Sequence, residues 1–363
     1  MKNSFGNNIT LTLFGESHGE YIGAVLDGLT PGIKIDHSEI KRALSKRRPS
    51  GGASTARIEA DNYKIISGEH NGYTTGTPLT VIIPNENRKS GDYSATQNKP
   101  RPSHADFAAE MKYHGYQDKR GGGHFSGRIT AALVAIGGII MPMLNNKGIY
   151  IGTHISRLGE VSDRAFDNYQ NDIDSLKMAD FPTLDGEVGD KMLSTAEDVK
   201  KHGDSIGGIL ETAIIGIPAG VGEPWFDTVE GMLSHAVFSV PAVKGIEFGL
   251  GFGFGGARGS EVNDQLYTDG STVLTKTNNN GGINGGITNG MPIIFRSAVK
   301  PTPSIFIEQD TVDLVKMENC KITIEGRHDA TILPRVAPVI DAVTAITVAD
   351  MLVGRFGTDY FNS

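Results

Sequence analysis

Apolar residues at helical spacing, preceded by capping side chains, predict two helices in the first third of the chain. Asp36 and Glu39 have the spacing of a capping box, and apolar residues follow at helical intervals up to position 44. Ser103 is predicted to cap a second helix, with Asp106 at its third position. His104 would then lie in the first turn of that helix.

Two longer segments are apolar around most of a helical circumference. Residues 126–143 predict a long buried helix, and residues 338–352 predict another. Short strand-like runs lie between the helices, at residues 9–14, 24–26, 79–83, 209–215 and 293–296. Because helices and strands do not alternate regularly, the pattern favours α+β layers over a doubly wound parallel sheet.

The chain shows no internal repeat and no linker, so residues 1–363 are expected to form a single domain. The most polar stretch, residues 163–203, is interpreted as an excursion over the surface. The longest apolar stretch, residues 129–144, is short for a membrane span and contains glycine and proline. No basic segment followed by a long apolar run opens the sequence, so we expect a cytoplasmic protein without membrane contact.

Composition adds limits on the chemistry. A net charge of −8 argues against nucleic-acid binding, whereas the local basic cluster at residues 46–48 indicates a small anionic ligand or a solvated helix end. The single cysteine, Cys320, excludes an intramolecular disulfide and a cysteine-based metal cluster. The histidines are scattered singly without an H-E-x-x-H motif, so no metal site is expected. The 47 glycines cluster in short runs, which suits tight turns or close approach to a ligand.

Two glycine motifs do not support the function that they suggest. Gly251, Gly253 and Gly256 fit G-x-G-x-x-G, but the following residues are a poor helix start, which disfavours dinucleotide binding. Residues 203–208 are similar to the nucleophile loop of trypsin-like proteases, but they carry an extra isoleucine and have no evident histidine–aspartate partners.

Two histidine-containing segments are candidates for chemistry. In residues 14–19, Ser17 and His18 follow a predicted strand in a glycine-flanked turn that can present them to a pocket; an ordinary turn with a capping histidine is the alternative. In residues 101–106, His104 would meet free amides and the positive end of a helix dipole, which disfavour a protonated imidazole. A nearby phosphate would oppose that effect.

Further segments suit anion binding. Residues 121–128 run from glycines into a helix N-terminus, which can cradle an anion, although glycines before a helix also serve plain turning. Residues 300–304 form a rigid polar loop that could hold phosphate, and Arg327 could contribute a bidentate fork. Asp329 could act as a base.

Taken together, these segments resemble the signature sequences of the chorismate synthase family, in the family order and spacing, from about position 6 to position 352. The blocks are residues 14–19, 101–106, 121–128, 239–245, 281–290, 300–304 and 326–329. The resemblance implies a β-α-β sandwich with helices packed between antiparallel sheets, assembled as a homotetramer. It implies anti-1,4-elimination of phosphate and a C6 proton from 5-enolpyruvylshikimate 3-phosphate to give chorismate, the last step of the shikimate pathway, using reduced FMN without net redox change.

The resemblance also implies residue roles. His18 is similar to the family histidine that protonates or holds the reduced flavin, and His104 to the histidine beside the departing phosphate. Asp329 is similar to the carboxylate that keeps flavin N5 deprotonated, so that N5 can accept the substrate proton. The implied FMN contacts are His124, Phe125, Ser126, Pro241, Ala242, Gly285, Lys300, Pro301, Thr302, Pro303, Ser304 and Arg327. The implied substrate contacts are Ser17, Arg47, Arg48 and Arg128.

The chain departs from the family pattern at some positions. Ala53 stands where many members have an arginine assigned to nicotinamide nucleotide or substrate, and His124 and Phe125 stand where many have arginine and serine. We therefore expect reduced FMN from an external flavin reductase, with NADPH only as an indirect reductant. Two other hypotheses remain at this point: a catalytically inactive flavin- or phosphate-ligand-binding protein, and a metal-dependent hydrolase built on the scattered histidines.

Overall fold

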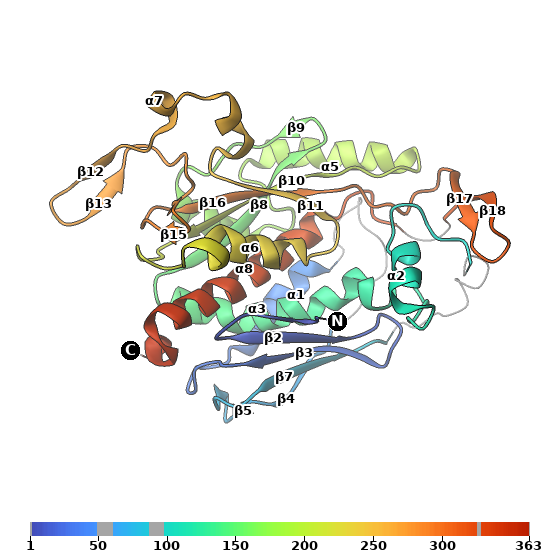
Figure 1. Ribbon diagram of the computed structural model, residues 1–363, viewed down its shortest axis with the longest axis horizontal. Helices are drawn as coiled ribbons and strands as arrows, with labels where there is room; N and C mark the ends of the chain where they lie inside the picture. The colour runs from blue at the N-terminus through green and yellow to red at the C-terminus, as the bar shows by residue number, and fades with distance from the viewer. Residues whose placement is uncertain (1, 49–60, 87–97, 325–327, 363) are drawn as a thin grey trace.

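Two antiparallel five-stranded sheets enclose a layer of helices in the computed structural model, which describes residues 2–48, 61–86, 98–324 and 328–362 (Figure 1). The first sheet has the order β1-β2-β3-β7-β4, with strands Ser4–Phe5, Thr10–Gly15, Tyr21–Asp27, Leu79–Pro84 and Lys64–Ser67. The second has the order β11-β16-β10-β8-β9, with strands Val243–Phe248, Ile293–Val299, Gly208–Ile215, Tyr150–Leu158 and Val161–Ser162. The β-α-β sandwich and the α+β class are thereby confirmed.

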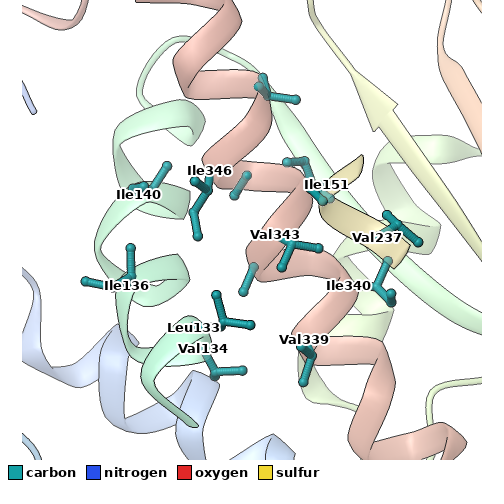
Figure 2. Close-up of a cluster of buried hydrophobic side chains, with 14 of the residues drawn as sticks. Leu133, Val134, Ile136, Ile140, Ile151, Val237, Val339, Ile340, Val343 and Ile346 are labelled. Carbon is teal, nitrogen blue, oxygen red and sulfur yellow. The ribbon is translucent and has the colours of Figure 1, made fainter. Parts of the chain in front are cut away.

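The helices between the sheets are α1 (His37–Arg47), α3 (Thr130–Asn145), α6 (Val229–Phe238) and α8 (Leu333–Phe356). Both α3 and α8 are buried along nearly their whole length, as the all-round apolar pattern of the sequence predicted. Figure 2 shows the two helices side by side, with Leu133 and Ile140 of α3 on the side of α8, where Val343 and Ile346 lie. This layer forms the centre of one continuous hydrophobic core.

Two adjacent glycines allow the helices of this layer to approach closely. A Cβ at Gly137 would lie 2.5 Å from the Cβ of Ala342 on α8, and a Cβ at Gly138 would lie 2.8 Å from the Cα of Ile40 on α1. Any larger residue at either position would therefore have to push α1 or α8 away from α3. Segments around α3 and α8 are long and apolar enough to span a membrane, but 83% and 94% of their most apolar windows are buried inside the protein.

Most predicted elements agree with the structure, with three corrections. Asp36 caps α1 by accepting from the amides of Ser38 and Glu39, but the Glu39 side chain binds Arg42 and does not complete a capping box. Ser103 does not cap α2 (Asp106–Tyr113), because its φ of 59° is left-handed and Ala105 is the N-cap residue.

The third correction concerns residues 163–203. The stretch interpreted as a surface excursion contains two helices that the sequence did not predict, α4 (Tyr169–Met178) and α5 (Gly186–Lys201). The helices bury Ile173 and Met192, and α5 lies beside the second sheet, on the side away from the central helices (Figure 1). The last turn of α4 reaches α1, where Lys46 donates to the carbonyl of Leu176. The apolar faces of α4 and α5 are narrow, so their many charged residues outweighed the helical pattern in the sequence.

Shorter elements extend from the two ends of the sandwich. The small hairpins are β5–β6 (Glu69–His70, Tyr73–Thr74), β12–β13 (Leu266–Thr268, Val273–Thr275), β14–β15 (Ile283–Asn284, Ile287–Thr288) and β17–β18 (Gln309–Asp313, Glu318–Ile322). The four-residue helix α7 (Gly259–Val262) follows the turn of 3-10 helix η5 (Gly251–Gly256), so the G-x-G-x-x-G motif does not open a long helix. In Figure 1, α2 and β17–β18 lie at one end of the molecule and β12–β13 at the other.

Candidate active site

The turn between β2 and β3 presents the first candidate catalytic histidine. Ser17 and His18 are 7% and 4% exposed, and the Ser17 hydroxyl lies 3.0 Å from Nδ1 of His18. The backbone amide of Ser17 donates to the carbonyl of Gly123 at 3.0 Å. The turn is thus fastened to the glycine run that precedes α3.

Gly121 packs closely against the His18 ring. A Cβ at Gly121 would lie 2.5 Å from Cε1 of His18, and the glycine has a φ of +65°. No other residue can take this place without displacing the imidazole or straining the backbone. The carbonyl of Gly121 also accepts from Arg101 at 2.9 Å, which connects this region to the segment that carries His104.

The residues that follow the glycine run end at the start of α3. Nδ1 of His124 donates to the carbonyl of Gly15 at 2.8 Å, and the Ser126 side chain accepts from the Arg128 amide at 3.2 Å. Ser126 therefore caps the 3-10 turn η3 (Gly127–Ile129) that leads into α3. Phe125 is 43% exposed, with its ring edge-on to Tyr113 at 6.0 Å.

The second candidate histidine lies just before α2 rather than in its first turn. Arg101 holds this turn by pairing with Asp106 through Nε at 2.8 Å and Nη2 at 2.8 Å. Nδ1 of His104 lies 3.1 Å from the carbonyl of Pro102, which can only accept, so Nδ1 carries the proton. Nε2 of the neutral ring accepts from the Ser304 hydroxyl at 3.0 Å.

Burial lowers the pKa of His104 to about 4, and the positive charge of Arg101 acts in the same direction. The helix dipole invoked from the sequence is not needed for this effect, because His104 is outside the helix. Three other groups act more weakly: the Pro102 carbonyl and Asp106 raise the pKa, and Lys300 lowers it. In the absence of an anion the imidazole is therefore neutral at pH 7 and able to take up a proton.

The polar loop after β16 completes the surroundings of His104. Lys300 donates from Nζ to the carbonyl of Ser103 at 2.6 Å and from its amide to the carbonyl of Ala242 at 3.0 Å. Burial, together with the charge of Lys244, lowers the pKa of Lys300. Thr302 has a buried hydroxyl that makes no hydrogen bond within the described part of the chain.

Two cationic side chains pair with one buried carboxylate. Asp61 accepts from Nη1 of Arg128 and, at 3.4 Å, from Nη2 of Arg47; all three side chains are at most 8% exposed. Nε of Arg128 donates to Oδ1 of Asn85 at 3.0 Å. Arg48 directly follows α1 as its C-cap residue.

Asp329 joins the same group through Arg335 in the first turns of α8. Nη1 of Arg335 lies 2.5 Å from Oδ2 of Asp329, and its Nε donates to the carbonyl of Arg47 at 3.2 Å. Asp329 is 7% exposed. Arg327, expected at FMN, lies outside the described residues, as does Ala53.

Among the residues that the structure describes, the predicted site residues other than Gly285 are brought together. Contacts run from His18 through Gly121 and Arg101 to the His104 turn. They continue to the 300–304 loop, which includes Pro301 and Pro303. Lys300 of this loop contacts Ala242, next to Pro241. Gly285 is in the β14–β15 turn, whose neighbour Gly286 accepts from Val229 on α6. No described contact joins that turn to the histidines within one chain.

Three residues of this cluster were not predicted from the sequence: Asp61, Asn85 and Arg335. Each binds a predicted residue that is far away along the chain, with Arg335 and Arg47 separated by 288 positions. Local patterns carry no signal for such contacts. The one available signal is the position of Asn85, an amide side chain directly after a predicted strand, where site residues are often found.

The arrangement suits proton transfer on a polyanionic ligand. Buried arginines at one end and Lys300 at the other can bind carboxylate and phosphate groups, because charge-assisted hydrogen bonds are strong where water is excluded. The neutral imidazole of His104 and the buried carboxylate of Asp329 can serve as proton-handling groups at the same ligand. Among the residues that the structure describes, no group of three or more histidine, cysteine or acidic side chains could hold a metal ion.

Comparison with known proteins identifies relatives over nearly the whole length. Residues 9–353 match the family model described as chorismate synthase. The chain is 46% identical over 351 residues to the chorismate synthase of Pyrococcus abyssi, covering 96% of this chain and 97% of that protein. It is 42% identical over 352 residues to that of Dehalococcoides mccartyi, covering 97% of this chain and 96% of that protein.

A solved structure supports the same relationship. A crystal structure of chorismate synthase superimposes with a TM-score of 0.78 at 27% sequence identity, covering 98% of this chain and 95% of that chain.

Proposed function

Because the chain belongs to the chorismate synthase family and is a lyase that forms chorismate from 5-enolpyruvylshikimate 3-phosphate, we propose that His18, His104 and Asp329 carry the reaction in this protein and that it uses reduced FMN. The observation that supports this most strongly is a chain of contacts between segments that lie far apart in the sequence. Arg101 and Gly121 join the His104 turn to His18. From the His18 turn the contacts continue to Asp329 through Asn85, Arg128, Asp61, Arg47 and Arg335. The hypotheses of an inactive binding protein and of a metal-dependent hydrolase have no observation in their favour.

The residues near Lys300 fit a flavin phosphate. Thr302 has a buried hydroxyl that lacks a hydrogen bond, and buried polar groups without partners are costly unless a ligand satisfies them. Lys244 and Lys300 are close enough for their charges to interact, which favours an anion between or beside them. The proposed FMN contacts are His124, Phe125, Ser126, Pro241, Ala242, Gly285, Lys300, Pro301, Thr302, Pro303, Ser304 and Arg327.

The buried arginines are proposed to bind the substrate. Arg47, Arg48 and Arg128, with Ser17, would meet its two carboxylates and its phosphate, and these charges would fix the ring in one orientation. Reduced FMN, when bound, supplies an electron to the substrate and recovers it within the same turnover, so the reaction has no net redox change.

The protein's own groups handle the protons. His104 takes up a proton at Nε2 when the phosphate dianion arrives and delivers it to the departing phosphate oxygen. Asp329, held by Arg335, would keep flavin N5 deprotonated, so that N5 could accept the C6 proton. His18, enclosed by Ser17 and Gly121, is proposed to hold a proton beside the flavin.

We also propose a single domain over residues 1–363, a cytoplasmic homotetramer and an external flavin reductase, with NADPH only as indirect reductant and with no membrane or nucleic-acid partner. The continuous core supports the single domain. Trp225, Phe226 and Phe252 are at least 85% exposed in one chain, and such exposed aromatic residues are typical of subunit contacts. Sedimentation of the purified protein would give the number of subunits.

An anaerobic assay tests the function. Purified protein is supplied with substrate and with oxidised FMN, dithionite-reduced FMN, or dithionite alone, and chorismate and phosphate are measured. We expect chorismate and phosphate in equal amounts, and only when reduced FMN is supplied. A chelator should not change this result. Product formation without flavin would contradict the cofactor proposal, and no product at all would contradict the activity.

A further inference from the structure

Asn85 connects the two halves of the candidate site through its backbone and side chain. It directly follows β7 and is 4% exposed. Its amide nitrogen donates to the carbonyl of Glu20 at 3.0 Å, and Nδ2 donates to the carbonyls of Glu16 and Gly19, both at 2.9 Å. These carbonyls belong to the turn that carries His18.

The other end of the same amide holds a substrate-binding candidate. Oδ1 of Asn85 accepts from Nε of Arg128 at 3.0 Å. The carbonyl of Pro84 accepts from Nη2 of Arg128 at 3.2 Å, so residues 84 and 85 together orient the guanidinium. One side chain therefore sets the position of the His18 turn relative to Arg128.

The chemistry of these partners explains why the residue is an asparagine. Carbonyl oxygens can only accept and a guanidinium can only donate, so the orientation of the amide is fixed by its neighbours. An aspartate could still accept from Arg128 but would turn an oxygen toward two carbonyl oxygens. An alanine would satisfy neither side.

We propose that Asn85 is a positioning residue. It keeps the His18 turn and Arg128 at a fixed position relative to each other, so that the substrate bound by Arg128 is aligned with the proton-handling groups. The inference rests on the proposed roles of His18 and Arg128. Its physical basis is that reaction rates depend steeply on the alignment of the reacting groups, so that a displacement of about 1 Å can lower a rate about 100-fold.

Two substitutions separate the two functions of the amide. Asn85→Asp keeps an acceptor for Arg128 and removes the donors to the His18 turn; we expect a nearly unchanged KM for 5-enolpyruvylshikimate 3-phosphate and a kcat about 100-fold lower. Asn85→Ala removes both, and its KM should in addition rise about tenfold, the effect of one lost charge-assisted hydrogen bond.

A matched control is Thr74→Val. Thr74 is 5% exposed, and its hydroxyl likewise joins two segments by donating to the carbonyl of Thr30 at 2.7 Å and accepting from the amide of Ile33 at 2.9 Å. It lies in the β5–β6 hairpin, so its loss should lower the melting temperature without changing kcat or KM.

All variants would be assayed anaerobically with dithionite-reduced FMN, and their melting temperatures recorded. Because a smaller folded fraction would also lower the apparent kcat at an unchanged KM, each kcat is divided by the folded fraction taken from the melting curve at the assay temperature. The expected loss of about 100-fold in Asn85→Asp must remain after this correction. A wild-type kcat in Asn85→Asp, or identical kinetic behaviour of Asn85→Ala and Thr74→Val, would overturn the inference. If Asn85→Ala does not fold, Asn85→Asp still decides. Absence of activity in the wild-type protein would instead refute the proposed function.

Discussion

The hydroxyl of Ser304 donates to Nε2 of His104 across 3.0 Å, although the two residues are 200 positions apart. The contact joins the polar loop after β16 to the turn before α2. It occupies the one nitrogen of His104 that can accept a proton, since Nδ1 is committed to the carbonyl of Pro102. Proton uptake by His104 thus requires the serine hydroxyl to reorient.

Replacing Ser304 should affect turnover more than folding. In Ser304→Ala the imidazole loses its hydrogen bond at Nε2 and keeps only the one at Nδ1 to Pro102. Misalignment of an acid catalyst is expected to lower kcat about tenfold. Ser175→Ala is a suitable control, because that hydroxyl donates to the carbonyl of Asp172 on α4, away from the site. Steady-state kinetics with reduced FMN would measure both; equal kcat values for the two variants would contradict a role for the Ser304 contact.

Binding of substrate should be coupled to proton uptake. At pH 6 His104 is neutral in the free protein, because burial and Arg101 hold its pKa at about 4. A phosphate dianion beside it raises the pKa, so His104 gains a proton on binding. Titration calorimetry in two buffers with different ionisation enthalpies would detect this uptake, and His104→Gln should lose it. Equal uptake in the variant and the wild type would place the proton elsewhere.

Removing the carboxylate between the two buried arginines should make the stability of the protein depend on added anions. Asp61→Asn leaves Arg47 and Arg128 without their shared counter-ion, which is expected to lower the free energy of unfolding by about 3 kcal/mol. Inorganic phosphate should restore part of the loss, because it binds the folded state in place of the carboxylate.

The control for this test is Asp172→Asn in α4, which removes another nearly buried carboxylate and breaks its ion pair with Arg164 at 2.6 Å. Melting temperatures would be compared with and without phosphate. A larger phosphate-induced increase for Asp61→Asn than for either the control or the wild type is expected. The same increase in all three proteins would show that these arginines do not bind the anion.

A buried histidine on the second sheet should make stability depend on pH. His154 lies 3.1 Å from Asp163 and 3.3 Å from Glu211, and Glu211 also pairs with Arg296. Burial alone would lower the pKa of His154, but the hydrogen bonds to Asp163 and Glu211 outweigh it and raise the pKa above its usual 6.5. The folded protein therefore holds this proton more tightly than the unfolded chain.

The resulting stabilisation is complete below pH 6.5 and is lost as the pH rises through the folded-state value. His154→Gln should cost about 3 kcal/mol of unfolding free energy at pH 6 and less at pH 9. Denaturant unfolding at both pH values would measure this, with the exposed His202→Gln as control. A cost for His154→Gln that is equal at pH 6 and pH 9 would show that the histidine is not protonated in the fold.

The sequence predicted those parts of the fold that depend on local pattern. The all-round apolar character of α3 and α8 correctly indicated buried helices, and Asp36 correctly marked the start of α1. Ser103 was misleading because its backbone takes a left-handed conformation in which it cannot cap α2. The backbone conformation of a single residue before a helix is set by its tertiary contacts, here the hydrogen bond from Lys300 to its carbonyl.

The candidate site was predictable where residue type carries the chemistry and unpredictable where it depends on distant partners. His18, His104 and Asp329 stood out by their segments, whereas Asp61, Asn85 and Arg335 matter only because of the groups that they hold. These three contacts form only when α1, β7 and the start of α8 come together in the folded chain.

The central claim, a lyase whose reduced flavin is not consumed, is tested most directly by counting turnovers per flavin. Stoichiometric FMN would be photoreduced, the electron donor removed, and excess 5-enolpyruvylshikimate 3-phosphate added without oxygen while chorismate, phosphate and flavin absorbance are followed. Many molecules of chorismate per flavin, equal phosphate release and a flavin that remains reduced are expected. One chorismate per flavin with matching flavin oxidation would contradict the account.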